Sequence, residues 1–112
     1  MSDCLFCKMV TGDIKADVVF EDDHILAFRD INPQAPVHIL IIPKAHIATL
    51  NDLDDTQLAG HLLQAAIKIA EQEGLTEAGY RTVFNCNKNG GQEVYHLHLH
   101  LLGGRQLSWP PG

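Results

Sequence analysis

Residues 96–101 restrict the fold most strongly, because they read HLHLHL, a strict alternation of histidine and leucine. Successive side chains of a β-strand point to opposite faces, so this period of two predicts a strand with one imidazole face and one apolar face. Neighbours on one face lie roughly 6.5–7 Å apart, because a strand rises about 3.3 Å per residue. His96, His98 and His100 could therefore all line one pocket, although they are too widely spaced to bind one metal ion without bending of the strand, which is expected to span residues 93–104.

The rest of the chain predicts the other elements of a small α+β domain. Residues 17–23 and 24–31 indicate a hairpin, and the β-branched run VHILIIP at 37–43 indicates a central strand. Apolar residues at helical spacing predict one long helix over residues 54–73, which would cover one face of the sheet. The remaining expected elements are an N-terminal helix (1–12), a fourth strand (80–87), a glycine-rich turn (88–92) and an irregular tail (105–112). The sum is a single domain over residues 1–112, with a five-stranded antiparallel meander and two helices.

The composition narrows the classes of partner. A chain of 112 residues forms one domain with a small core, so a dimer or a bound metal ion would help to stabilise it. The net charge is −6, from 8 basic and 14 acidic residues without a basic stripe, so long nucleic acids are not expected partners. A small phosphorylated ligand is compatible, because a local site can oppose the overall charge. No window is long enough for a membrane span and no signal peptide is visible, so a cytoplasmic protein is expected.

The alternating histidines point to chemistry rather than to a solvated surface. A polar surface would normally mix histidine with lysine, glutamate, serine or threonine, and the alternation contains none of these. Imidazole acts as a nucleophile, a proton donor or an anion-binding cation near neutral pH. The preceding pair Gly90 and Gly91 can present backbone N–H groups to phosphate oxygens. The segment is therefore suited to phosphoryl or nucleotidyl transfer, with a solvated polar face as the alternative.

The three cysteines do not form a disulfide framework, because their number is odd and no export signal accompanies them. Cys4 and Cys7 form a C-x-x-C pair on the expected N-terminal helix. The pair is either inert or half of a tetrahedral zinc site, which needs two further nitrogen or sulfur ligands. Cys86 is expected to be a small buried strand residue.

Two long blocks carry a resemblance to a known family. The block GGQEVYHLHLHLLGGRQLSWPPG resembles the signature of the histidine triad (HIT) superfamily, and AFRDINPQAPVHILIIPKAHI is similar to a second diagnostic block of its Hint branch, the histidine triad nucleotide-binding proteins. The resemblance covers nearly the whole chain, and GGQEVYH is typical of bacterial members. It implies a HIT-like fold whose sheet continues into that of a second copy, in a homodimer.

The resemblance implies roles for the residues around the alternation. His98 would attack the α-phosphorus of a nucleotide derivative, giving a nucleotidylated histidine that water hydrolyses, while a backbone carbonyl holds its other ring nitrogen. His100 would donate to the phosphate oxygens or the leaving group, and Asn85 would contact the same groups. His38 would orient the triad, although a buried core histidine is the alternative there.

The nucleoside would be bound by a second set of residues that the resemblance implies. Asp30 would accept from the ribose hydroxyls. The expected walls of the base pocket are Phe6, Phe28, Ile31 and Leu40, each of which taken singly could be ordinary core. The loop expected to contact phosphate through its main chain contains Gly91, Gln92 and Val94. Glu93 stands where animal members carry a serine that is thought to help protonate the leaving group, so that role is not carried over.

A metal site and an interface follow from the same resemblance. Some HIT proteins and the related uridylyltransferases hold a structural zinc through a C-x-x-C pair, a histidine after a PK turn and the first histidine of the triad. The matching residues are Cys4, Cys7, His46 and His96. Trp109 lies in the tail that, in Hint proteins, crosses a dimer interface toward the partner's active site, although simple anchoring of the tail is the alternative.

The function that the resemblance implies is that of a purine nucleoside phosphoramidase. Such an enzyme hydrolyses adenosine 5′-phosphoramidates or aminoacyl adenylates to AMP without an organic cofactor. The alternatives are a dinucleoside polyphosphate hydrolase, and a nucleotide-binding scaffold whose hydrolysis is incidental. The ending GGRQLSWPPG favours the Hint branch over the polyphosphate hydrolases.

Overall fold

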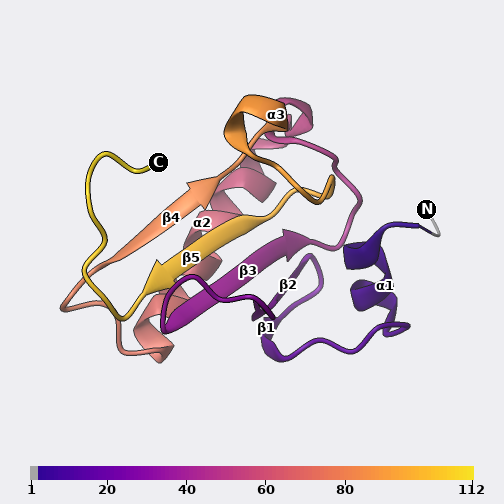
Figure 1. Cartoon of the computed structure of the whole chain (residues 1–112). Coiled ribbons are helices and arrows are strands. Elements are labelled where there is room, and N and C mark those ends of the chain that lie inside the picture. Colours follow the sequence, from indigo (N-terminus) through magenta and orange to yellow (C-terminus); the bar gives the residue numbers. More distant parts are fainter. Residues whose placement is uncertain (1–2) are drawn as a thin grey trace.

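The computed structural model, which describes residues 3–112, contains one five-stranded antiparallel sheet with helices on both faces (Figure 1). The strands are β1 (Val18–Glu21), β2 (Ile25–Arg29), β3 (Val37–Pro43), β4 (Tyr80–Phe84) and β5 (Leu99–Gly103). The helices are α1 (Leu5–Thr11), the 3₁₀ turn η1 (Leu50–Asp52), α2 (Thr56–Gln72) and α3 (Asn87–Gly90). The predicted α+β class, the five antiparallel strands, the short N-terminal helix and the long helix are therefore confirmed. None of these helices is long and apolar enough to cross a membrane.

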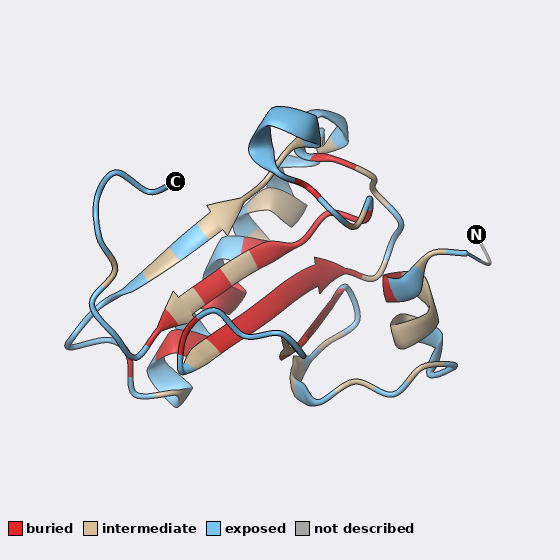
Figure 2. Ribbon diagram, in the orientation of Figure 1, coloured by how far each residue is buried: buried red, intermediate tan, exposed pale blue. Residues whose placement is uncertain are grey.

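The strand order is β1-β2-β3-β5-β4, so the expected simple meander is wrong. After β3 the chain passes through α2 to the sheet edge as β4, and β5 then enters between β3 and β4. The burial of the two strands explains this order, because β5 is mostly buried whereas β4 is partly exposed along its length (Figure 2). A strand with an exposed face tolerates the sheet edge better than one that is apolar or functional on both faces.

One face of the sheet packs against α2 and forms the main core. Ile39 and Ile41 of β3 lie opposite Leu101 and Leu99 of β5, and all four are buried. From α2 the core receives Leu62, Ala66 and Ile69. Burying each large aliphatic side chain contributes about 1.5–3 kcal/mol. The leucines of the alternation therefore face the helix, as the period of two predicts.

Helix α2 begins and ends with ordinary capping chemistry, within two residues of its predicted bounds. The Asp55 carboxylate accepts hydrogen bonds from the backbone N–H groups of Gln57 and Leu58, which have no partner within the helix. Gly74, at a φ of 74°, follows the last turn in the left-handed conformation that glycine tolerates best.

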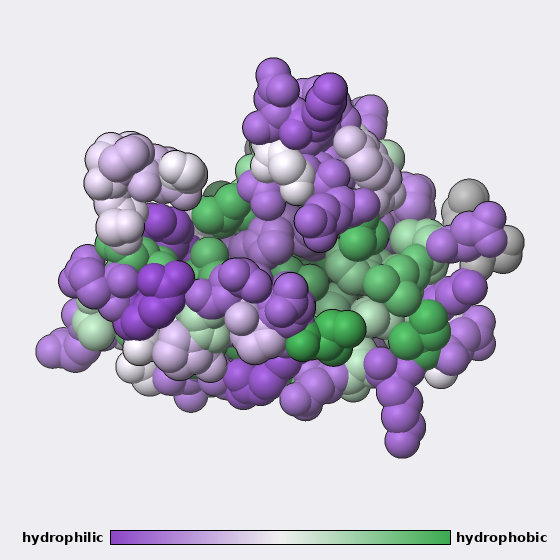
Figure 3. Space-filling view, viewed as in Figure 1, coloured by the Kyte–Doolittle hydropathy of each residue, from purple (hydrophilic) through white to green (hydrophobic). Residues whose placement is uncertain are grey.

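The other face of the sheet carries α1 over a smaller apolar cluster. Phe6 of α1 packs with four buried side chains of β2 and β3, namely Leu26, Phe28, Leu40 and Ile42. Figure 3 shows this face, with apolar side chains gathered between the sheet and α1. His100 lies on the same face, because its strand partner is Leu40. The small cluster therefore borders the imidazole face.

Strand β5 is shorter than predicted, and His96 and His98 precede it rather than lying on it. The pairing with β3 ends at Ile41 and Leu99. Two residues further the register would bring Leu97 opposite Pro43, which has no N–H to donate. The Leu97 N–H instead donates to the carbonyl of Ile47 at 2.6 Å.

Residues 88–92, predicted as a glycine-rich turn, overlap the single helical turn α3. That turn ends at Gly91, which has a φ of 78°. The buried Gln92 side chain then fixes the following loop, because it accepts from the Asn87 N–H and donates to the carbonyls of Ala48 and Val94.

Candidate functional site

A cavity of about 330 Å³ opens on the face of the sheet opposite α2. Its walls come from α1, from residues 15–17, from the end of β2 and the residues that follow it, from the middle of β3, and from β5 with the loop that leads into it. The expected nucleoside and catalytic residues that line it are Phe6, Phe28, Asp30, Ile31, Leu40, Val94, His98 and His100. Ile31 is 94% exposed at the rim, so it is the one wall residue that is not already part of the core.

His98 is held with one ring nitrogen free. Its Nδ1 lies 2.7 Å from the backbone carbonyl oxygen of His96. A carbonyl can only accept, so Nδ1 carries the proton and Nε2 keeps its lone pair. Burial is the main cause that lowers the pKa of His98, which favours the neutral ring. The arrangement is that of a neutral imidazole nucleophile.

A chain of hydrogen bonds holds His100 in the tautomer opposite to that of His98. The backbone N–H of Gln34 donates to Nδ1 of His38 at 3.0 Å, so the proton of the neutral His38 ring lies on Nε2. That nitrogen lies 2.9 Å from Nδ1 of His100 and donates to it. The remaining proton of a neutral His100 ring therefore lies on its Nε2.

The Nε2 group of His100 is a buried donor without a hydrogen-bond partner among residues 3–112. Burial, followed by the neighbouring His98 and His38, lowers the pKa of His100 to about 4, so the ring is neutral near pH 7. Leaving a buried donor unpaired costs about 1–3 kcal/mol. An acceptor such as a phosphate oxygen would recover this cost.

Asp30 adds a carboxylate to the cavity. Its Oδ1 accepts from the backbone N–H of Asn32 at 2.9 Å, and its Oδ2 lies 3.5 Å from Nε2 of His38. The carboxylate is partly exposed and retains acceptor capacity for hydroxyl groups of a ligand.

A second group of side chains lies beside the cavity and could hold a metal ion. The ligand atoms of Cys4, Cys7, His46 and His96 all lie within 4.8 Å of one another. The Sγ–Nδ1 distances are 3.3 Å from Cys4 to His96, 3.3 Å from Cys7 to His46 and 3.6 Å from Cys7 to His96. A tetrahedral zinc ion, with bonds of about 2.3 Å to sulfur and 2.0–2.1 Å to nitrogen, would separate such atoms by about 3.6 Å. The donor set therefore fits one tetrahedral ion.

The hydrogen bonding of His96 also fits a metal ligand. Its Nε2 donates to the carbonyl oxygen of Pro43 at 2.8 Å, so Nδ1 presents its lone pair toward the two sulfur atoms. Metal-binding histidines commonly donate their second nitrogen to a carbonyl in this way. His96 is fully buried and does not line the cavity, so the three alternating histidines do not share one pocket, and His96 lies with Cys4, Cys7 and His46.

The HIT domain model matches residues 11–107 of this sequence. The chain belongs to the HIT family. Among similar proteins, a purine nucleoside phosphoramidase of Escherichia coli is 54% identical over 105 residues, which cover 92% of this chain and 88% of that protein. An uncharacterized HIT-like protein of Synechococcus elongatus is 60% identical over 112 residues, or 98% of this chain and 97% of that protein.

Solved structures of HIT proteins share the fold closely. A HIT family hydrolase from Legionella pneumophila superposes with a TM-score of 0.96 at 65% identity, covering 98% of this chain and all of that one. A histidine triad protein from Clostridium difficile gives a TM-score of 0.93 at 44% identity, with 96% of each chain covered.

Three of the residues expected to contact phosphate do not line the cavity. Asn85 and Gly91 lie on either side of α3, and the Gln92 side chain is occupied by the loop contacts described above. Contact between phosphate and these residues stays a prediction.

The cavity also contains side chains that were not predicted from the sequence. Met9 is the most predictable of them, because it follows Phe6 at helical spacing and so shares its face of α1.

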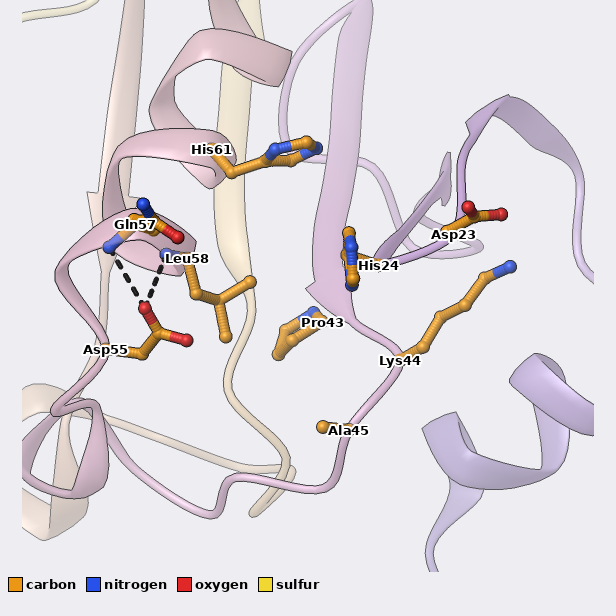
Figure 4. A pocket seen from close by; sticks show the side chains of 9 residues that line it. All are labelled: Asp23, His24, Pro43, Lys44, Ala45, Asp55, Gln57, Leu58 and His61. Atoms are coloured by element: carbon orange, nitrogen blue, oxygen red, sulfur yellow. Dashed lines mark hydrogen bonds between the residues drawn. The ribbon is translucent and has the colours of Figure 1, made fainter.

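A larger hollow of about 500 Å³ lies near the start of α2, away from the triad (Figure 4). Two of the polar side chains that line it already have structural tasks. Asp55 caps α2, and His61 pairs with Asp22 at 2.7 Å. The combination of a free imidazole lone pair and an unpartnered imidazole N–H is found in the triad cavity, which is therefore the candidate active site.

We predict that His100 stays neutral as the pH falls to about 5, one unit above its pKa of about 4. At this site the folded state binds fewer protons than the unfolded chain, whose histidine titrates near 6.5. The contribution of His100 to stability is therefore present above about pH 6.5 and is lost as the pH falls toward 4. An NMR titration of the imidazole resonances checks this, with His100→Gln used to assign the signal. A midpoint at pH 6 or above would contradict it.

Proposed function

We propose that this HIT protein is a purine nucleoside phosphoramidase. It hydrolyses the P–N bond of adenosine 5′-phosphoramidates, and accepts aminoacyl adenylates, to give AMP. The observation that carries the proposal is the pairing of opposite imidazole states, with a free Nε2 lone pair on His98 and a free Nε2–H on His100. The 54% identity to the Escherichia coli phosphoramidase supports the same reaction.

In the first step, Nε2 of His98 forms a bond to the α-phosphorus as the P–N bond breaks. The electron pair of that bond leaves with the amine, which takes a proton from solvent. The nucleotidylated imidazole carries a positive charge, and its Nδ1–H remains bonded to the His96 carbonyl at 2.7 Å. A dipole already aimed at this charge stabilises it without reorganisation.

In the second step, water attacks phosphorus and the bond to His98 breaks. The products are AMP and one proton, and the lone pair returns to Nε2. In both steps the Nε2–H of His100 donates to a phosphate oxygen, and Asp30 accepts from the ribose. The purine lies between the apolar walls, including Phe28 and Leu40. Asn85 and the main chain at Gly91, Gln92 and Val94 contact the phosphate.

Two other functions use the same site. A dinucleoside polyphosphate hydrolase would break a P–O bond by the same two steps, and a nucleotide-binding scaffold would bind without significant turnover. The identity to a phosphoramidase favours P–N cleavage over both.

We expect the wild-type protein to cleave an adenosine phosphoramidate faster than a dinucleoside polyphosphate, and His98→Ala to lose about 10³-fold or more in kcat, because it lacks the nucleophile. Product analysis by chromatography measures both rates. His24→Ala is the matched control, because it removes an exposed histidine outside the cavity and should keep the wild-type rate. Retained P–N cleavage by His98→Ala would exclude the mechanism, and tight binding without turnover by the wild type would favour the scaffold.

We propose that the metal of the second group is zinc, bound by Cys4, Cys7, His46 and His96. Two thiolates and two imidazoles are a donor set that zinc prefers in tetrahedral sites. The ion would have a structural task, because all four ligand positions are filled by protein. It would fasten α1 to the segment that precedes β5.

Protein purified without added metal should contain about one zinc per chain, because the four donor atoms already lie together. Cys7→Ser should lose most of it, whereas Cys86→Ser should keep it, since Cys86 lies outside the group. Elemental analysis by mass spectrometry gives the ratio. A wild-type zinc content of a small fraction per chain would eliminate the site.

We also propose that the protein is a homodimer in which the two sheets join into one. Strand β4 is at a sheet edge, so one row of its backbone groups has no strand partner within residues 3–112. The tail lies beside this edge, because Arg81 of β4 donates to the carbonyl of Ser108. Trp109, 80% exposed, would then reach toward the partner's active site and influence specificity.

Sedimentation equilibrium should give twice the chain mass of 12.4 kDa at micromolar concentration, because the exposed edge and the exposed Trp109 become covered on association. A concentration-independent mass of one chain would contradict the dimer.

A further inference from the structure

Phe6 lies between the metal group and the cavity. In the sequence it lies between Cys4 and Cys7, and both cysteines direct their sulfur atoms at His96 or His46. Its own side chain lines the cavity and is 4% exposed. The first turn of α1 therefore presents sulfur to one site and an aromatic ring to the other.

The Phe6 ring makes edge contacts with a histidine from each site. Its centroid lies 5.9 Å from that of His96 in the metal group, and 5.2 Å from that of His98 at an interplanar angle of 90°. On the other side it meets Phe28, a wall of the cavity, at 5.4 Å. Any displacement of Phe6 thus changes both the cavity wall and the packing around the proposed nucleophile.

His96 provides a second connection between the same sites. Its Nδ1 faces the sulfur atoms, while its backbone carbonyl accepts the Nδ1–H of His98 at 2.7 Å. The residue that would bind the metal therefore also selects the tautomer of the residue proposed to attack phosphorus.

Helix α1 depends on these contacts for its position. It has seven residues, and helices of this length are not stable on their own in water. Apart from the small apolar cluster around Phe6, its attachment to the rest of the chain is through Cys4 and Cys7. A metal ion bound to both cysteines and both histidines would fix the helix and, with it, the cavity wall.

We propose that the metal group and the nucleotide cavity are thermodynamically coupled through Phe6 and His96, which act as positioning residues. A bound metal ion strengthens nucleotide binding, and a bound purine nucleotide strengthens metal binding. The inference rests on the proposed function, because it takes the cavity to be a nucleotide site. Coupling of this kind is reciprocal, so both affinities change by the same factor, typically about 5–150-fold.

The test uses the full chain in two forms, loaded with one zinc and stripped by a chelator. Calorimetry with AMP gives the first arm, in which removal of zinc should raise the dissociation constant by roughly 5–150-fold. Competition with a chromophoric chelator gives the second arm, in which saturating AMP should tighten zinc binding by the same factor. Neither arm measures turnover.

Variants separate the coupling from simple loss of the fold. Phe6→Leu keeps an apolar side chain but removes the ring between His96 and His98, so it should retain zinc while the coupling factor falls to the part that His96 carries. Cys7→Ser should bind AMP as weakly as the stripped protein. Cys86→Ser is the control and should keep the full factor, because it lies outside the metal group and does not line the cavity.

Each outcome decides one point. Equal AMP affinity of the loaded and stripped forms would overturn the coupling and leave the phosphoramidase proposal intact. An undiminished coupling factor in Phe6→Leu would overturn the route through Phe6. The same result is expected, and overturns the route in the same way, if zinc acts only because the stripped chain unfolds. Failure of the zinc-loaded protein to bind AMP would overturn both this inference and the proposed function.

Discussion

The rest of the structure depends on the pleat of β5, because the side chains of this one short strand must fill the core on one face of the sheet and line the candidate site on the other. Leu99 and Leu101 complete the core under α2, and His100 between them points to the opposite face. A slip of one residue in the register would move the imidazole into the core and the leucines into the cavity. The order β3-β5-β4 keeps this strand between two neighbours, where both of its edges are paired.

The three imidazoles of one alternation take two tautomers, because different groups hold their rings: His96 and His100 carry the proton on Nε2, and His98 carries it on Nδ1. The Pro43 carbonyl binds His96 at Nε2, and the His96 carbonyl binds His98 at Nδ1, so the free lone pairs lie on opposite ring nitrogens. The state of His100 is set through His38, which receives the Gln34 N–H. Fixed hydrogen-bond partners thus select the tautomers, and the metal group and the cavity are adjacent because one residue separates His96 from His98.

These relations explain what could be predicted from the sequence. The division of leucines and histidines between two faces follows from the period of two alone, and the four metal residues followed from the family resemblance. The start of β5 did not, because it depends on the register of the folded sheet, which would place Leu97 opposite Pro43 beyond the last pair, Ile41 and Leu99. The tautomer of His38 was not predicted either, because only the conformation of the loop brings the backbone N–H of Gln34, four residues earlier, to its ring. Residue types alone determine neither the register nor that conformation.

The unpartnered donor of the cavity is the neutral Nε2–H of His100, although Lys15 and Arg29 also line the cavity and the chain as a whole is acidic, with a net charge of −6. The pKa of His100 is too low for an imidazolium near pH 7, and Asp30 adds a negative charge nearby. In the proposed reaction the one new positive charge in the cavity is that of nucleotidylated His98. Burial lowers the pKa of His98, whereas the His96 carbonyl and the Asp30 carboxylate raise it. In the proposed reaction these two groups would therefore offset part of the cost of the positive charge on the covalent intermediate.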